Sequence, residues 1–298
     1  MGELRSPGQA KAYPTDGGEM TVAGWGILAV LTSTAIPRSE VAGIMLRVAV
    51  NQETARDARA SYVYRQEQTI RMRRPGGKVA REQHAEYVVT PGKEGVDKKL
   101  EKFEGKYQYK GQYVTYDQPG YIYRGLDIDG DLIRDMANDM MNDKKSQDGI
   151  GHDLFPLTGE EQRKYDFRLV GKEEYRGRSV YRVAFQPKHG SDLDIGDAWK
   201  GEALIDAEEY QPVSVETSMA GKVPGWVKVV FGTDIKGLGF SLSYRKFADG
   251  VWFPVSYGGE FAVRGLFFYR RNISVAMTNS DFRKTDVKST LVYATDIH

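Results

Sequence analysis

The sequence predicts a mainly β (α+β) protein, in which a strongly curved antiparallel sheet of about ten or eleven strands forms an incomplete barrel closed by helices. Three observations predict this class. Most of the chain alternates apolar and polar residues, Gly-containing turn signals separate these runs, and two segments switch to helical periodicity. A flat sheet of this size would leave one apolar face partly uncovered, whereas a sheet that curls around a helix buries it.

The composition bounds the function. The 298 residues are 40% hydrophobic and 11% aromatic, which is enough to build a sizeable core. Lys and Arg total 42 and Asp and Glu total 41, and this balance argues against a general electrostatic nucleic-acid binder. The chain has no cysteine, which excludes disulfides, thiolate metal sites, thiol catalysis and a lipid-anchored N-terminal cysteine.

The N-terminal apolar run, residues 21–36, resembles the central region of a secretory signal. It is short and rich in Gly, Ser and Thr for a membrane span, and Ser33 and Ala35 provide the small residues of a cleavage site. We therefore expect residues 1–35 to be a signal peptide and leader, and residues 36–298 to be a single domain. The alternative is a buried N-terminal helix.

Two later segments have helical periodicity. Residues 39–60 place apolar side chains at i, i+3, i+4 and i+7, and residues 127–146 carry a methionine-rich stripe. Asp129 or Asp131 can cap the second helix. This helix is either part of an ordinary core or a movable lid over an apolar cavity. The two stripes comprise Val41, Ile44, Met45 and Val48, and Ile133, Met136, Ala137 and Met140.

The remaining segments predict strands. Between residues 62 and 116 they form hairpins with turns at residues 74–78 and at Lys110–Gly111. From residue 165 the chain is almost wholly β, and we expect a turn at Gly258–Gly259. In the hairpin of residues 200–217 we expect one concave-facing set and one outward-facing set. The first is Ala203, Ile205, Val213 and Val215, and the second is Glu202, Asp206, Ser214 and Glu216.

A search for reactive groups gives no catalytic or metal motif. The four histidines lie far apart, and neither acidic cluster, residues 127–131 or 192–197, matches an EF-hand loop. We therefore expect no cofactor and no metal. The basic residues of the first hairpin, Arg71, Arg73, Arg74, Lys78 and Arg81, are interpreted as outward-facing charges that keep the strands soluble, with contact to anionic lipid headgroups as the alternative.

Four stretches carry a family resemblance: YDFRLVGKEEYRGRSVYRVAFQP from Tyr165, GEALIDAEEYQPVSVET from Gly201, DGVWFPVSY from Asp249 and TNSDFRK from Thr278. In this order they resemble the outer-membrane lipoprotein carrier (LolA/LolB-like) superfamily, which includes outer-membrane lipoprotein-sorting proteins and the sensor domain of the sigma-E regulator. The resemblance implies an incomplete barrel with an apolar cavity that receives acyl chains. No residue of this chain is matched to the lid-latching arginine of that family.

The hypothesis is a non-enzymatic periplasmic protein, secreted across the inner membrane and not lipid-anchored, that holds lipid or lipoprotein acyl chains. The resemblance implies a part in lipoprotein sorting to the outer membrane. The expected partner is lipid or an acylated lipoprotein. An envelope stress sensor or protein-interaction module, with an envelope protein partner, is the second hypothesis, and a hydrolase is the third. The candidate lining residues are Tyr62, Tyr64, Met136, Met140, Phe167, Tyr181, Phe185, Ile205, Val215, Val229, Phe240 and Leu242.

Overall fold

The computed structural model describes residues 38–92, 95–123, 125–141, 156–189, 199–220, 234–247, 250–265 and 269–285. The chain divides into two units, residues 1–35 and residues 36–298, and every described residue lies in the second. The expected signal peptide and leader lie outside the described residues. No described helix is both long and apolar enough to span a membrane.

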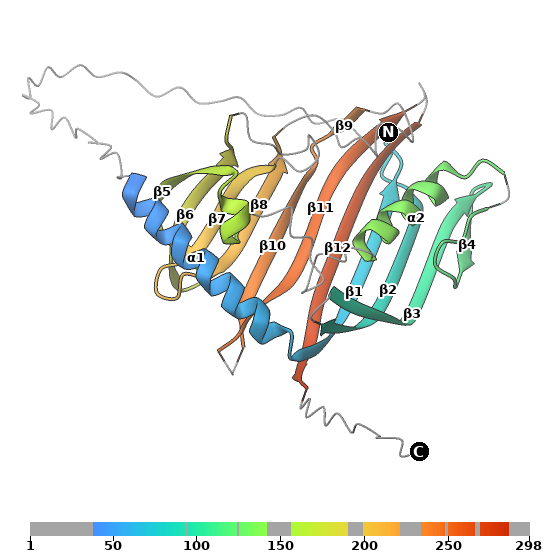
Figure 1. The fold of residues 1–298 in the computed structure, drawn as a ribbon. Coiled ribbons are helices and arrows are strands. Elements are labelled where there is room, and N and C mark those ends of the chain that lie inside the picture. Colours follow the sequence, from blue (N-terminus) through green and yellow to red (C-terminus); the bar gives the residue numbers. More distant parts are fainter. Residues whose placement is uncertain are drawn as a thin grey trace, which may run out of the picture. The chain divides into compact units, whose positions relative to one another are not determined.

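The described strands form one antiparallel sheet of twelve strands (Figure 1). Their order is β4-β3-β2-β1-β12-β11-β10-β8-β7-β6-β5, with β9 paired to β11. The edge strands β4 and β5 do not pair with each other, so the barrel is incomplete, which confirms the predicted fold class. The strands are β1 (Tyr62–Arg73), β2 (Val79–Gly92), β3 (Gly95–Tyr109), β4 (Gln112–Tyr116), β5 (Tyr165–Tyr175), β6 (Arg178–Pro187), β7 (Trp199–Asp206), β8 (Pro212–Met219), β9 (Asp234–Lys236), β10 (Gly239–Lys246), β11 (Trp252–Gly265) and β12 (Tyr269–Lys284).

Strand β12 joins the two halves of the chain. It pairs with β11 on one side and with β1 on the other, so that Ile70 lies opposite Val275. Hairpin-connected strands β1 to β4 extend the sheet on one side of β12, and strands β11 to β5 extend it on the other. The first and last strands of the described domain therefore lie next to each other in the middle of the sheet.

The helices are α1 (Arg38–Arg59), α2 (Ile128–Met141) and the short α3 (Gly159–Gln162). All four stripe residues of α1 are buried, as the helical periodicity predicts. Ile133 and Met136 of α2 are buried too. The expected cap of α2 is wrong: Asp127 precedes the helix, and its carboxylate accepts a hydrogen bond from the backbone N–H of Gly130 at 2.8 Å.

The predicted turn at Gly258–Gly259 is also wrong, because β11 continues through both residues. A Cβ on Gly258 would lie 2.9 Å from the carbonyl oxygen of Val275, and a Cβ on Gly259 would collide with the carbonyl oxygen of Gly239. These glycines therefore permit close approach of neighbouring backbones within the sheet rather than a change of chain direction.

The β7–β8 hairpin departs from the prediction at its turn, although Asp206 keeps its predicted side, opposite Val180 of β6. Asp206 is buried, and one of its carboxylate oxygens accepts hydrogen bonds from the backbone N–H groups of Glu208 and Glu209, at 3.0 and 2.9 Å. The register shifts at Ile205, and Val213 packs with Leu204 rather than under α1. A one-residue irregularity in the pairing changes the face that a strand residue occupies. Ala203, Ile205 and Val215 nevertheless keep the predicted face.

We predict that Asp206→Asn lowers the free energy of unfolding by about 1–3 kcal/mol at neutral pH, because Arg178 loses the carboxylate to which it is hydrogen-bonded at 2.9 Å and keeps only that of Glu209, at 3.8 Å. Burial opposes ionisation of Asp206, but hydrogen bonds from Glu209, Arg178 and Glu208 outweigh it and hold its pKa below the ordinary value. The contribution of Asp206 to stability is therefore present at pH values above the ordinary aspartate pKa. It is lost as the pH falls through the lowered pKa of the folded protein.

Urea unfolding at neutral and acidic pH measures this effect. The difference between the wild type and Asp206→Asn should shrink on acidification, while Glu216→Gln, at an exposed position of the same hairpin, should change little at either pH. A difference between wild type and Asp206→Asn that is the same at both pH values would contradict the assignment.

Candidate functional site

One face of the sheet, here called the helix-covered face, carries both long helices. Leu242 of β10 lies opposite Tyr257 of β11, Tyr257 lies opposite Met277 of β12, and Met277 lies opposite Gln68 of β1. Residues opposite each other in antiparallel strands point to the same side. Leu242 packs against α1, and Ile70, two residues beyond Gln68, packs against α2. Both helices therefore cover the same face.

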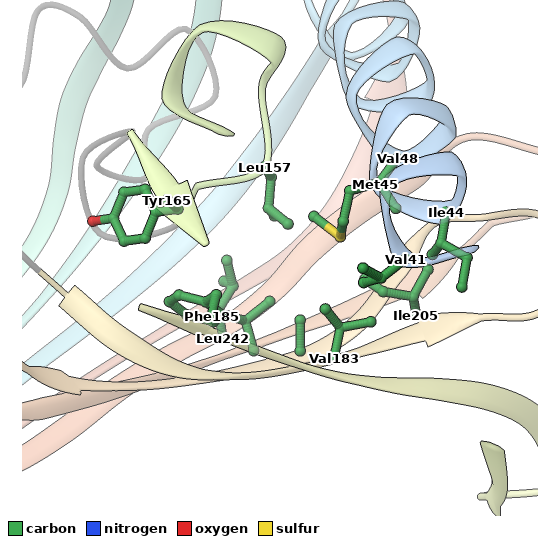
Figure 2. Close-up of a cluster of buried hydrophobic side chains, with 12 residues drawn as sticks. Val41, Ile44, Met45, Val48, Leu157, Tyr165, Val183, Phe185, Ile205 and Leu242 are labelled. Carbon is green, nitrogen blue, oxygen red and sulfur yellow. The ribbon is translucent and has the colours of Figure 1, made fainter. Parts of the chain in front are cut away.

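Helix α1 covers the part of this face formed by β5 to β10. In Figure 2, its stripe residues point toward the side chains of Val183, Phe185 and Ile205 on the sheet. The buried side chains of α1 and of the strands beneath it are here called the α1 cluster. Six of the predicted lining residues belong to the α1 cluster or pack against it, so α1 side chains already contact this part of the sheet. They are Phe167, Tyr181, Phe185, Ile205, Val215 and Leu242.

Helix α2 covers the part of the face formed by β1, β11 and β12. Leu132, Ile133 and Met136 form its apolar side, and Met136 is the one predicted lining residue in this α2 cluster. Methionine is unbranched and adapts to irregular apolar partners. The sheet residues beneath are Ile70, Met72, Phe261, Val263, Tyr269, Ile273 and Val275.

The other predicted lining residues are dispersed. Tyr62 is buried edge-on against Phe253, and Tyr64 is buried in a further cluster with Tyr87. Phe240 stacks on Tyr257, with ring centroids 5.1 Å apart. Tyr257 contacts both the α1 and the α2 cluster, so Phe240 lies near their junction. The side chain of Met140 and all of Val229 lie outside the described residues.

Polar contacts hold α1 along its length. The carbonyl of Met45 accepts a hydrogen bond from the Gln162 side chain at 2.9 Å, in the N-terminal half. In the C-terminal half, the Asn51 amide donates to the carbonyl of Glu209, and Arg59 donates to the carbonyl of Trp252. These contacts tie α1 to α3, to the β7–β8 turn and to β11.

Helix α2 is held at its N-terminal end by two arginines from the sheet. Arg81 of β2 pairs with Asp127 at 2.7 Å, and Arg271 of β12 pairs with both carboxylate oxygens of Asp129 at 2.8 and 2.9 Å. Tyr269 also donates its hydroxyl proton to Asp129 at 2.7 Å. Burial, together with the charge of Asp129, raises the pKa of Tyr269, so this hydroxyl stays protonated and remains a donor.

Arg81 is among the most buried side chains described, with 1% of its surface exposed. Besides Asp127, its guanidinium donates to the Tyr116 hydroxyl at 3.2 Å and to the carbonyl of Tyr121. It also lies over the rings of Tyr107 and Tyr116, at 5.6 and 4.8 Å. Burial alone would lower the pKa of Arg81, but Tyr116 and Asp127 raise it, so the buried charge is retained.

The interpretation of Arg81 as an outward-facing charge is therefore wrong. Two other arginines of that interpreted set, Arg71 and Arg73, are about one-third exposed, as the interpretation expected. The sequence does contain a signal that Arg81 is buried. In the alternation of β2, Arg81 falls on the same face as Ala85, Tyr87 and Val89, which are all buried. Among the described residues, no three His, Asp or Glu side chains converge to hold a metal ion.

We predict that Arg81→Met destabilises the protein by about 3–5 kcal/mol, because it leaves the Asp127 carboxylate, which is only 11% exposed, without a countercharge. Arg81→Lys should rescue little of this loss, since one ammonium cannot reproduce the fork that reaches Asp127, Tyr116 and Tyr121 together. The double variant Arg81→Met/Asp127→Leu should recover part of it.

Urea unfolding of the three variants measures these differences, with Arg73→Met as the control at a partly exposed position of the same hairpin. Equal losses for Arg81→Met and Arg73→Met would contradict the role assigned to Arg81.

Known proteins match the chain only at the level of structure. No family model and no curated protein matches its sequence. Solved structures similar to it include a DUF1329 family protein from Desulfovibrio piger (TM-score 0.38, 14% identity, covering 83% of this chain and 94% of that one). Another is an outer membrane lipoprotein-sorting protein domain from Vibrio parahaemolyticus (TM-score 0.35, 11% identity, covering 80% of this chain and 92% of that one). A third is a LolA superfamily protein from Nitrosomonas europaea (TM-score 0.32, 11% identity, covering 80% of this chain and 96% of that one). They include members of the superfamily that the sequence resembles, and the similarity is one of fold.

Proposed function

We propose that this chain is a non-enzymatic envelope protein that holds acyl chains of lipid or of a lipoprotein between α2 and the helix-covered face. The observation that carries the proposal is the difference between the two helices. Helix α1 is hydrogen-bonded to its surroundings in both of its halves, whereas the described ion pairs between α2 and the sheet lie at the N-terminal end of α2. A helix held at one end can swing away from an apolar surface and return to it.

The energies permit such an exchange. Lifting α2 exposes three buried apolar side chains, Leu132, Ile133 and Met136, at a cost of roughly 1.5–3 kcal/mol each. An acyl chain recovers about 0.8 kcal/mol for each methylene that it buries, so roughly twelve methylenes contribute about 10 kcal/mol. A long acyl chain can therefore replace the apolar side of α2, and a short one cannot.

The predicted lining residues take two roles in this proposal. Those under α1, such as Phe185, Ile205 and Leu242, would form the permanent core that fixes the sheet. Met136 would be displaced by the ligand, and Phe240, beside Tyr257, would line the ligand's path at the junction of the clusters. The periplasmic location and a part in lipoprotein sorting rest on the apolar run of residues 21–36 and on the resemblance of the sequence.

Native mass spectrometry of the protein purified from the envelope, with displacement of a fluorescent fatty acid in vitro, tests the proposal. We expect co-purified acylated species and saturable binding. Met136→Trp should weaken binding by roughly tenfold or more, because it fills the space beneath α2.

The matched control is Asp135→Asn, which changes a partly exposed side chain on the same helix and should leave the affinity unchanged. A protein that carries no acyl species and does not bind the fatty acid would overturn the proposal. A stable protein partner recovered without lipid would favour the envelope sensor instead.

A further inference from the structure

A row of buried amide side chains interrupts the apolar helix-covered face. Gln66 and Gln68 of β1 and Asn279 of β12 point to this face and are at most 5% exposed. On β1, Ile70 and Met72 lie on one side of the row, and Tyr62 and Tyr64 lie on the other. Amides in the middle of a largely apolar surface reduce its affinity for a plain hydrocarbon, so their presence requires a reason.

Hydrogen bonds fix the orientation of this row. The carbonyl of Pro254 can only accept, so the Asn279 side chain turns its N–H₂ group toward it, at 3.0 Å. The oxygen of Asn279 is then left to accept from the N–H₂ group of Gln66, at 2.9 Å. These two hydrogen bonds, from Asn279 to the Pro254 carbonyl and from Gln66 to Asn279, are here called the relay. The relay uses the N–H₂ group of Gln66, so the atom at its end is Gln66 Oε1, which is an acceptor.

Gln66 Oε1 is buried and has no hydrogen-bond partner among the described residues. An unsatisfied buried acceptor is destabilising, and native proteins contain few of them. Its immediate neighbours on this face, Tyr64, Gln68, Tyr87 and Asn279, include no carboxylate. A cationic donor would therefore be buried without a countercharge, and a neutral donor fits the position better.

We propose that Gln66 Oε1 accepts a hydrogen bond from the ligand, and that the ligand is an acyl chain with a neutral donor, a hydroxyl or an amide N–H, close to its polar end. The donor rests on the amide row while the hydrocarbon extends beneath α2. This inference rests on the proposed function and adds a selectivity to it: hydroxylated or amide-linked acyl chains are preferred over plain or ester-linked ones.

Competition of β-hydroxymyristate and myristate against a fluorescent fatty acid tests the selectivity. The two competitors have the same chain length and charge and differ by one hydroxyl. We expect the wild type to prefer β-hydroxymyristate by about three- to tenfold, the range that one net hydrogen bond provides. Gln66→Met, which keeps the length of the side chain but removes the acceptor, should abolish the preference and still bind myristate.

Asn279→Leu provides a second test that leaves Oε1 in place. It removes the group that orients the Gln66 amide, so the preference should fall although the acceptor remains. Gln83→Met is the matched control, since Gln83 is also a buried amide on this face but lies outside the relay, and it should keep the preference. Thermal melting of each variant separates loss of selectivity from loss of folding.

The outcomes separate the two proposals. If neither competitor displaces the probe from a folded wild type, the proposed function fails. If both bind equally to the wild type, or if Gln66→Met keeps the wild-type preference, acyl binding stands and this inference is overturned. An acceptor satisfied by a bound water instead of by the ligand would give that second result.

Discussion

An open sheet with one apolar face cannot bury that face by itself, and this constraint organises the whole domain. The strand order runs from β4 to β5 without closing, so the face that a complete barrel would seal stays available. Two helices from distant parts of the chain cover it, α1 ahead of the first strand and α2 between β4 and β5. The sheet provides a surface, and its properties depend on how firmly each cover is attached.

The two covers are attached by different means. Helix α1 combines its apolar stripe with neutral hydrogen bonds at both halves, so it behaves as part of the core. Helix α2 combines a smaller, methionine-containing contact with two partly buried arginine–aspartate pairs at one end. Such pairs are costly to break by losing one partner, yet add little net stability when intact. They fix where α2 starts, and they leave its apolar contact as the part that a ligand can replace.

Local patterns in the sequence predict the elements but not their partners. The helical stripe of α1 is buried as predicted, and the side chains of β1 alternate between buried and more exposed from Tyr62 to Met72. The Gly258–Gly259 error arises because a strand glycine that admits a neighbouring backbone has the same local signature as a turn.

Arg81 shows the complementary error, since its charge predicts an exposed face whereas its position in the alternation predicts a buried one. The acceptor on Gln66 could not be foreseen, because it depends on Asn279, which lies 213 residues away in the sequence.

Hydrogen exchange of the two helices, with and without a saturating fatty acid, tests the central claim most directly. If α2 is the exchangeable cover, its backbone amides exchange faster than those of α1 in the ligand-free protein, and their protection changes when the fatty acid binds while that of α1 does not. If the fatty acid binds and the protection of α2 is unchanged, or if α1 responds in its place, the account of α2 as the cover is contradicted.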